Sequence, residues 1–243
     1  MGFDEWGKMS EESTPVSKRP KWEQDTAEKV RASLRKFAKP LADLIKRDAN
    51  EGDTRLLITD MLCEGLGWDK YAELTTEYQV KGEFADYGVR LDQQLIAFIE
   101  VKRATTKLNS RHLRQVEMYA VNEGVEWLIL TNGWQWQVFR LIPGMPVTID
   151  LVLDVNLISD ESIAVKAAQM FYLHKESLKR GQIEEVWKAR AATAPKALAS
   201  AILSETVLNE LRKEVKRRSG HTIDSADLGR LVRDSVLVPE LAK

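Results

Sequence analysis

The sequence predicts an α/β protein whose strand-rich middle is preceded and interrupted by helices and followed by a helical C-terminal region. Short apolar runs between residues 74 and 151 are separated by turn residues, as in the strands of a sheet. On both sides of that span the apolar residues recur at helical spacing. The chain has 243 residues, enough for one well-packed domain with an appendage.

The N-terminal part should consist of a tail and a long helix. Residues 1–22 combine Gly, Ser, Thr, Pro and charges without periodicity, which predicts a flexible tail. Residues 22–49 then follow a helical pattern. Pro40 lies inside this pattern and should break or kink the helix, because proline lacks the N–H that a helix interior uses.

A second helix should begin at Asn50. This residue is a suitable N-cap, with Asp53 three residues later as its capping partner, and Gly65 or Gly67 should end the helix. Glu51 lies in the first turn. An acidic residue there also favours the helix macrodipole, so Glu51 has an explanation that requires no catalysis.

Three strands should follow, and the second and third should form a hairpin. The turn around Asp92 would pair these two strands antiparallel. The third strand is apolar on both alternating faces, which suits the middle of a sheet. The expected strands cover Leu74–Val80, Asp86–Leu91 and Leu95–Lys102.

A helix and three more strands should complete the middle of the chain. The helix should run from near Asn109 or Ser110 to Gly124. Trp134 and Trp136 share one strand face, where tryptophan covers a sheet more often than it stacks on bases. The expected strands cover Glu126–Thr131, Trp134–Leu141 and Val147–Leu151, and Asn132-Gly133 is a hairpin signal between the first two.

Only helical patterns occur from about Ser159 onward. These helices could pack on the core, dimerise or bind DNA. Basic residues around Arg217 alternate with Glu210 and Glu214, which favours a solvated face over a DNA contact. The expected helices cover Asp160–Leu173, Gln182–Ala191, Pro195–Leu203, Glu205–Arg218 and Ser225–Val236.

Charged side chains at the end of the central strand suggest a metal site. Glu100 and Lys102 project from the same face, and burying them costs on the order of several kcal/mol unless each finds a partner or a metal. The hairpin would bring Asp86 beside Glu100. Mg²⁺ accepts two such carboxylates and takes further ligands from water and phosphate, so it could activate water for phosphodiester hydrolysis. Lys102 could orient that water or offset charge in the transition state.

Other interpretations of this pattern remain open. Glu-x-Lys alone is a weak signal, because solvated faces often carry it, and Glu214-Val215-Lys216 in this chain is an example. Asp86, the apolar strand and the polar residues of the following helix together favour a nuclease-type site.

In the helix after the central strand, Gln115 and Tyr119 share one face at a spacing of four. Gln115 could reach Lys102, a metal-bound water or a phosphate, with Tyr119 supporting it. The alternative is an amide and a phenol packed at the helix margin.

Composition limits the kinds of partner. The formal net charge is −1, so any DNA contact must come from a local patch, and the candidates are Arg103, Lys107, Arg111 and Arg114. A solvated helix face explains each of them equally well. The single Cys63 excludes an internal disulfide, and three scattered histidines make a zinc site improbable. No signal peptide, membrane span or P-loop pattern occurs, so we expect a cytoplasmic protein that uses no ATP.

Several of these segments together resemble the N-terminal nuclease domain of type I restriction enzyme R subunits, and more closely small stand-alone proteins built on that domain, within the PD-(D/E)xK nuclease superfamily. The resemblance covers about residues 28–155. Ala85 stands where the family pattern has a proline, which contributes no ligand. The segments that carry the resemblance are Asn50 to Arg55, Leu66-Gly67-Trp68, Asp86-Tyr87, Phe98 to Arg103, Gln115 with Tyr119, and Leu130 to Trp134.

The resemblance implies an αβββαβ restriction-endonuclease-like core with a mixed sheet, and hydrolysis of DNA with Mg²⁺ as cofactor, for which Mn²⁺ is an expected substitute. The family's acidic pair falls on Asp86 and Glu100, and its other polar positions fall on Lys102, Gln115, Tyr119 and Glu51. We expect the metal ligands to be Asp86, Glu100 and Val101.

The sequence therefore predicts three regions: a tail over residues 1–22, a PD-(D/E)xK nuclease-like domain over 23–157 and a helical region over 158–243. The leading hypothesis is a Mg²⁺-dependent DNA endonuclease of restriction or defence type. The alternative is a catalytically silent nuclease fold that binds DNA or protein. A homodimer and a partner protein for targeting are both plausible, because one site per chain cuts two strands most simply as a pair.

Overall fold

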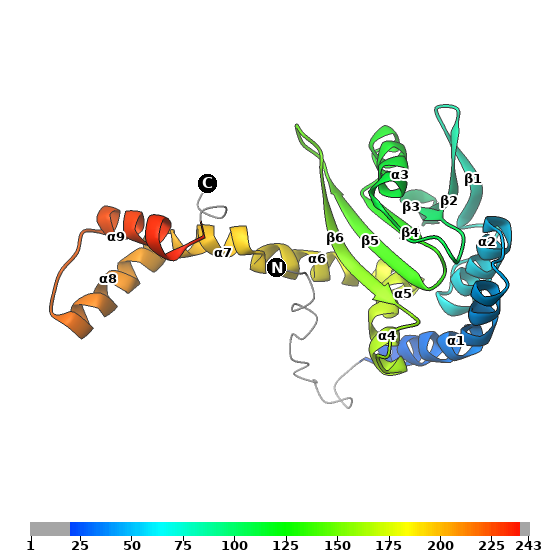
Figure 1. Cartoon of the computed structure of the whole chain (residues 1–243), viewed down its shortest axis with the longest axis horizontal. Helices are drawn as coiled ribbons and strands as arrows, with labels where there is room; N and C mark the ends of the chain where they lie inside the picture. The colour runs from blue at the N-terminus through cyan, green and yellow to red at the C-terminus, as the bar shows by residue number, and fades with distance from the viewer. Residues whose placement is uncertain (1–19, 239–243) are drawn as a thin grey trace. The chain divides into compact units, whose positions relative to one another are not determined.

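The computed structural model describes residues 20–238, so nearly all of the predicted tail lies outside the described residues. The described chain divides into two compact units, one ending at Ile183 and the other beginning at Glu184. Each unit is described by itself. The six-stranded sheet and most of the helices belong to unit 1 (Figure 1). No helix within residues 20–238 has the length and apolar character that a membrane span needs.

Two helices precede the sheet. Helix α1 (Lys21–Lys46) buries a stripe at helical spacing that includes Val30, Leu34 and Phe37. Pro40 lies inside α1, and the helix continues past it, so the expected break does not occur. The reason is that α1 is packed against the protein on both sides of the exposed proline. Helix α2 (Glu51–Asp60) follows and continues into a π-helical turn, η3 (Met61–Gly65).

The sheet has the order β1-β2-β3-β4-β5-β6, and all neighbours are antiparallel except β3 and β4. Helix α3 (Ser110–Glu123) connects the parallel pair, as a parallel connection requires a crossover. The order α2-β1-β2-β3-α3-β4 confirms the predicted α/β fold with its αβββαβ core and mixed sheet. The strands are β1 (Leu74–Val80), β2 (Glu83–Leu91), β3 (Gln94–Val101), β4 (Trp127–Thr131), β5 (Gln135–Ile142) and β6 (Thr148–Asn156).

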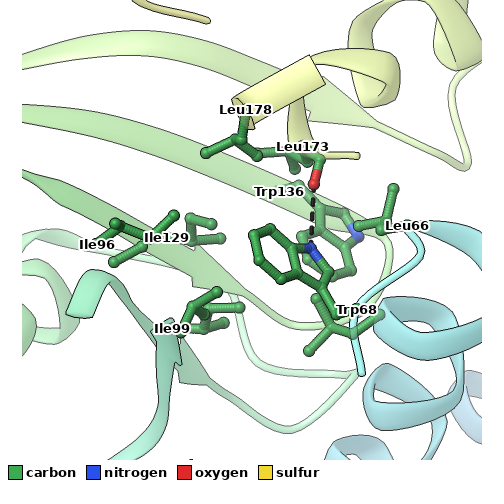
Figure 2. A pocket seen from close by; sticks show the side chains of 11 residues that line it. Leu66, Trp68, Ile96, Ile99, Ile129, Trp136, Leu173 and Leu178 are labelled. Carbon is green, nitrogen blue, oxygen red and sulfur yellow. Dashed lines mark hydrogen bonds between the residues drawn. The ribbon is translucent and has the colours of Figure 1, made fainter. Parts of the chain in front are cut away.

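Both faces of the central strand β3 are covered. On one face, Phe98 packs with Val116, Tyr119 and Ala120 of α3. On the other face, Trp68 and Trp136 lie against the sheet beneath Leu173 and Leu178, as Figure 2 shows. Trp68 Nε1 donates a hydrogen bond to the Leu173 carbonyl over 3.2 Å. Only about 10 Å³ of space remains in this apolar region, so it is packed core rather than a ligand site.

Three short helices after the sheet belong to unit 1: α4 (Ile163–Met170), η4 (Phe171–Leu173) and α5 (Lys175–Lys179). Helix α4 contacts α1 and β6, and Phe171 stacks near Trp22 of α1. Helix α6 (Gln182–Thr193) then carries the chain into unit 2. These contacts do not test whether residues 23–157 fold alone, so the predicted boundary at 157/158 stays a prediction.

Unit 2 contains the helices α7 (Pro195–Ile202), α8 (Glu205–Ser219) and α9 (Ser225–Leu231), followed by η5 (Val232–Val236). Leu208, Leu228 and Val232 form its small core. On the exposed face of α8, Lys213 pairs with Glu210, and Arg217 and Arg218 pair with Glu214. These pairs within the helix match the solvated face that the sequence favours there.

Candidate active site

The β2–β3 hairpin places Asp86 and Glu100 at adjacent positions. Tyr87 pairs with Ile99 in the antiparallel register, so the next position along the two strands sets Asp86 opposite Glu100. The backbone N–H of Val101 donates to Asp86 Oδ2 over 2.7 Å. The predicted juxtaposition of the two carboxylates is therefore present.

Glu100 is a buried carboxylate with one unsatisfied oxygen. The residue is 3% exposed, and its Oε1 accepts a hydrogen bond from Lys102 Nζ over 2.5 Å. Within the described chain, the buried Oε2 has no hydrogen-bond partner. Burial, and then the negative charge of Asp86, raise the pKa of Glu100 to about 7 despite the neighbouring lysine. The unpartnered oxygen can therefore take up either a proton or a cation.

Lys102 lies just after β3, beside Glu100. Burial alone would lower the pKa of Lys102, but the hydrogen bond to Glu100 and the charges of the surrounding carboxylates raise it overall. Lys102 is therefore a fixed cation that neutralises Glu100 and can donate hydrogen bonds. In this state it does not accept a proton.

Asp86 is held by a residue that the sequence analysis did not assign. Arg55 Nη1 donates to Asp86 Oδ1 over 3.0 Å, and Arg55 Nη2 lies 3.6 Å from Glu77 Oε1. Arg55 follows Glu51 by four residues on α2, so the two share one helix face. That spacing is the sequence signal that could have identified Arg55.

Glu51 lies in the first turn of α2 and is exposed. Its negative charge acts on both Glu100 and Lys102, which places Glu51 near the site without a direct contact to either. The start of α2 is fixed locally, because Asn50 Oδ1 accepts the N–H of Asp53 over 2.8 Å, as predicted. Thr54 Oγ1 also accepts the N–H of Ala104, which ties α2 to the segment after β3.

Gln115 and Tyr119 contact each other on α3. Gln115 Nε2 donates to Tyr119 Oη over 3.0 Å. Tyr119 is 1% exposed and packs edge-on against Phe98, and burial raises its pKa. The charge of Glu100 contributes to that rise, so Tyr119 lies within electrostatic range of the site. The described hydrogen bond of Gln115 is thus to Tyr119 rather than to Lys102.

His112 belongs to the basic stretch that follows the central strand, but the sequence did not place it at the metal site itself. It lies three positions before Gln115 on the same face of α3. Its Nδ1 is buried and lacks a hydrogen-bond partner among residues 20–238. Burial, and then the charge of Lys102, lower the pKa of His112, which favours a neutral imidazole.

The predicted DNA contacts have different environments. Arg103 donates to Asp48 and to the Ala49 carbonyl, so its guanidinium is engaged within the fold. Lys107, Arg111 and Arg114 are exposed, and none has an acidic partner within 4 Å in the described chain. Arg114 lines a shallow surface cavity of about 660 Å³ together with Glu83, Phe84, Gln115, Met118 and Tyr119.

The oxygen atoms of this site fit a hard divalent cation. Asp86 and Glu100 would hold it, with the backbone carbonyl of Val101 as the third predicted ligand, since the buried Val101 side chain offers none. The unpartnered Glu100 Oε2 supports this fit. No cluster of three or more His, Cys, Asp or Glu side chains in the described part of the chain is arranged to hold a metal, so the metal site stays a prediction.

Comparisons with known proteins identify one relationship. Residues 50–145 match the family model described as Type I restriction enzyme R protein N terminus. No curated protein and no solved structure matches the chain. The matched segment runs from the N-cap of α2 past the end of β5 and contains every candidate catalytic residue discussed above.

Proposed function

We propose that unit 1 is a nuclease that hydrolyses DNA phosphodiester bonds, because residues 50–145 match the family model described as Type I restriction enzyme R protein N terminus. The family indicates a nuclease-like role and DNA as the substrate. The finer proposal is a Mg²⁺-dependent endonuclease of restriction type, with Mn²⁺ as a substitute.

One observation carries this proposal. Asp86 and Glu100 face each other across the β2–β3 hairpin, and the buried Glu100 Oε2 has no partner within residues 20–238. A buried unsatisfied carboxylate oxygen costs about 1–3 kcal/mol or more, which a fold does not retain without compensation. A divalent cation supplies that compensation.

Each residue of the site has its own proposed role in hydrolysis. A divalent metal held by Asp86 and Glu100 would polarise the scissile phosphate and lower the pKa of an attacking water. Lys102 presents a fixed positive charge where negative charge develops on the phosphate. Tyr119, which accepts a hydrogen bond from Gln115, lies within electrostatic range of Glu100 on the α3 side, and Glu51 lies within electrostatic range of Glu100 on the α2 side.

DNA binding is proposed for three exposed cations on α3 and just before it. Lys107, Arg111 and Arg114 have no acidic partner in the described chain, so phosphate groups can neutralise them. With a net charge of −1 for the whole chain, such a local patch must provide the attraction.

The test is cleavage of plasmid and of single-stranded DNA with Mg²⁺, with Mn²⁺ and with chelator. Asp86→Asn and Glu100→Gln should each reduce cleavage by about a hundredfold or more, because each removes a charged metal ligand while conserving shape. Glu214→Gln is the matched control, since Glu214 belongs to an exposed Glu-x-Lys pair in α8 and should leave cleavage unchanged. Cleavage that survives both substitutions at Asp86 and Glu100 contradicts the assignment.

A catalytically silent DNA-binding or protein-interaction module is the second candidate. The observation in its favour is that each carboxylate already has a cationic partner, Arg55 for Asp86 and Lys102 for Glu100. For such a module, the wild-type chain would bind DNA without cleaving plasmid, single-stranded DNA or RNA. Self-association, a partner protein and independence from ATP also remain proposals.

A further inference from the structure

Arg55 lies between two carboxylates of neighbouring strands. Its Nη1 is 3.0 Å from Asp86 Oδ1, and its Nη2 is 3.6 Å from Glu77 Oε1. The Asp86 side chain is 13% exposed, whereas that of Glu77 is 67% exposed. The guanidinium therefore joins a nearly buried acid to one that faces solvent.

The register explains why these acids are close. Thr76 pairs with Tyr87 and Tyr78 pairs with Ala85, so the position between these pairs sets Glu77 opposite Asp86. Glu77 has a φ of 51°, in the left-handed region, and no ladder pair is formed at this position. Together with Glu100 on β3, the three acids form a row across three strands, and like charges in such a row repel.

The positive charges along this row are distributed unequally. Lys102 neutralises Glu100 through Oε1 only and leaves Oε2 free. Asp86 has both oxygens engaged, by Arg55 and by the N–H of Val101. A cation at Asp86 would therefore lie beside the positive charge of the Arg55 guanidinium, whereas Glu100 Oε2 accepts no hydrogen bond within residues 20–238.

We propose that Arg55 is a positioning residue that competes with a divalent metal for Asp86, and that Glu77 accepts the guanidinium when the metal binds. This rests on the proposed metal-dependent nuclease function. Arg55 neutralises Asp86 in the metal-free protein, and its move to Glu77 keeps it paired. The affinity for metal alone is lowered as a result, because the guanidinium repels a cation bound at Asp86 and has to move away from it.

The test is calorimetric titration of the full chain with Mn²⁺ in the absence of DNA. Arg55→Gln should tighten Mn²⁺ binding about tenfold, because the competing charge is gone. Glu77→Gln should weaken binding about twofold to fivefold, because the displaced guanidinium loses its exposed partner. The double variant should behave like Arg55→Gln alone, since Glu77 acts only through Arg55.

Arg47→Gln is the matched control. Arg47 pairs with Asp53 at the start of α2, so this variant makes the same change of charge and side chain without touching Asp86, and its Mn²⁺ affinity should equal that of the wild type. Thermal melting of each variant shows that it is folded.

Two results would overturn the inference. If Arg55 only held Asp86 in place, Arg55→Gln would bind Mn²⁺ more weakly than the wild type, or equally well, and the proposed nuclease function would stand without this competition. If neither the wild type nor Arg55→Gln bound Mn²⁺, the metal site and this inference would fail together.

Discussion

At the scale of single residues, Glu100 differs from the hydrophobic core around it because it is a buried carboxylate. Four of its neighbours on β3, Ala97, Phe98, Ile99 and Val101, are buried apolar residues, and in the same surroundings Glu100 retains a carboxylate with one unpartnered oxygen. Its raised pKa of about 7 reports the cost of that burial. Buried carboxyl groups with strongly raised pKa values cluster at functional sites.

Metal-dependent melting tests this interpretation of Glu100. Mg²⁺ at about 100 times its dissociation constant should stabilise the wild type by about 2.7 kcal/mol, since it binds the folded state only. Glu100→Gln should melt at a similar temperature without metal and gain nothing from Mg²⁺. An equal gain in both proteins would place the metal elsewhere.

His174 provides a second prediction at this scale. It is 5% exposed, its Nδ1 accepts the N–H of Glu176 at the start of α5, and Gly67 approaches its ring closely. Burial, and then the positive charge of Lys29, lower the pKa of His174 from 6.5 to about 4, and the hydrogen bond to Nδ1 requires the neutral ring.

Because the folded pKa of His174 lies below its unfolded value, its stabilising contribution is complete above pH 6.5 and is lost as the pH falls toward 4. That loss is at most about 3 kcal/mol. His174→Asn keeps an acceptor at the helix start and does not titrate, so urea unfolding should depend less on pH between 6.5 and 4. An unchanged pH dependence would contradict the assignment.

At the scale of elements, α2 and the β2–β3 hairpin assemble the site from segments that are distant in sequence. Helix α2 supplies Glu51 and Arg55 from one face, while the hairpin supplies Asp86 and Glu100 from adjacent strands. The N-cap at Asn50 fixes where α2 begins and so the position of Arg55.

Asn50→Ala should therefore affect function as well as stability. Loss of the cap should cost about 1 kcal/mol in urea unfolding and should also reduce DNA cleavage, because Glu51 and Arg55 shift with the first turns. Ser204→Ala is the control, since Ser204 caps α8 in unit 2 through the N–H of Val207. It should reduce stability without reducing the rate of cleavage per folded molecule.

At the scale of the whole molecule, the limits of unit 1 are the main question. Leu173 of η4 and Leu178 of α5 lie over the sheet face against which Trp68 packs, and Trp68 donates to the Leu173 carbonyl. Unit 1 includes these two elements and ends at Ile183.

Truncation distinguishes the two possible boundaries. Residues 1–183 should unfold cooperatively by circular dichroism, whereas residues 1–157 should not, because removal of α4, η4 and α5 exposes the apolar layer over Trp68 and Trp136. Cooperative unfolding of both fragments would instead support the boundary predicted at 157/158.

The sequence by itself determined the order of the six strands and of α1, α2 and α3, the N-cap at Asn50 and the proximity of Asp86 to Glu100. These features depend on local periodicity, turn chemistry and the register of one hairpin, all of which act over a few residues. The contact of Arg55 with Asp86, the unpartnered Nδ1 of His112 and the engagement of Arg103 with Asp48 were decided only by the tertiary structure. Their environments depend on how α2 and α3 lie against the sheet, and no spacing within a single element specifies that arrangement.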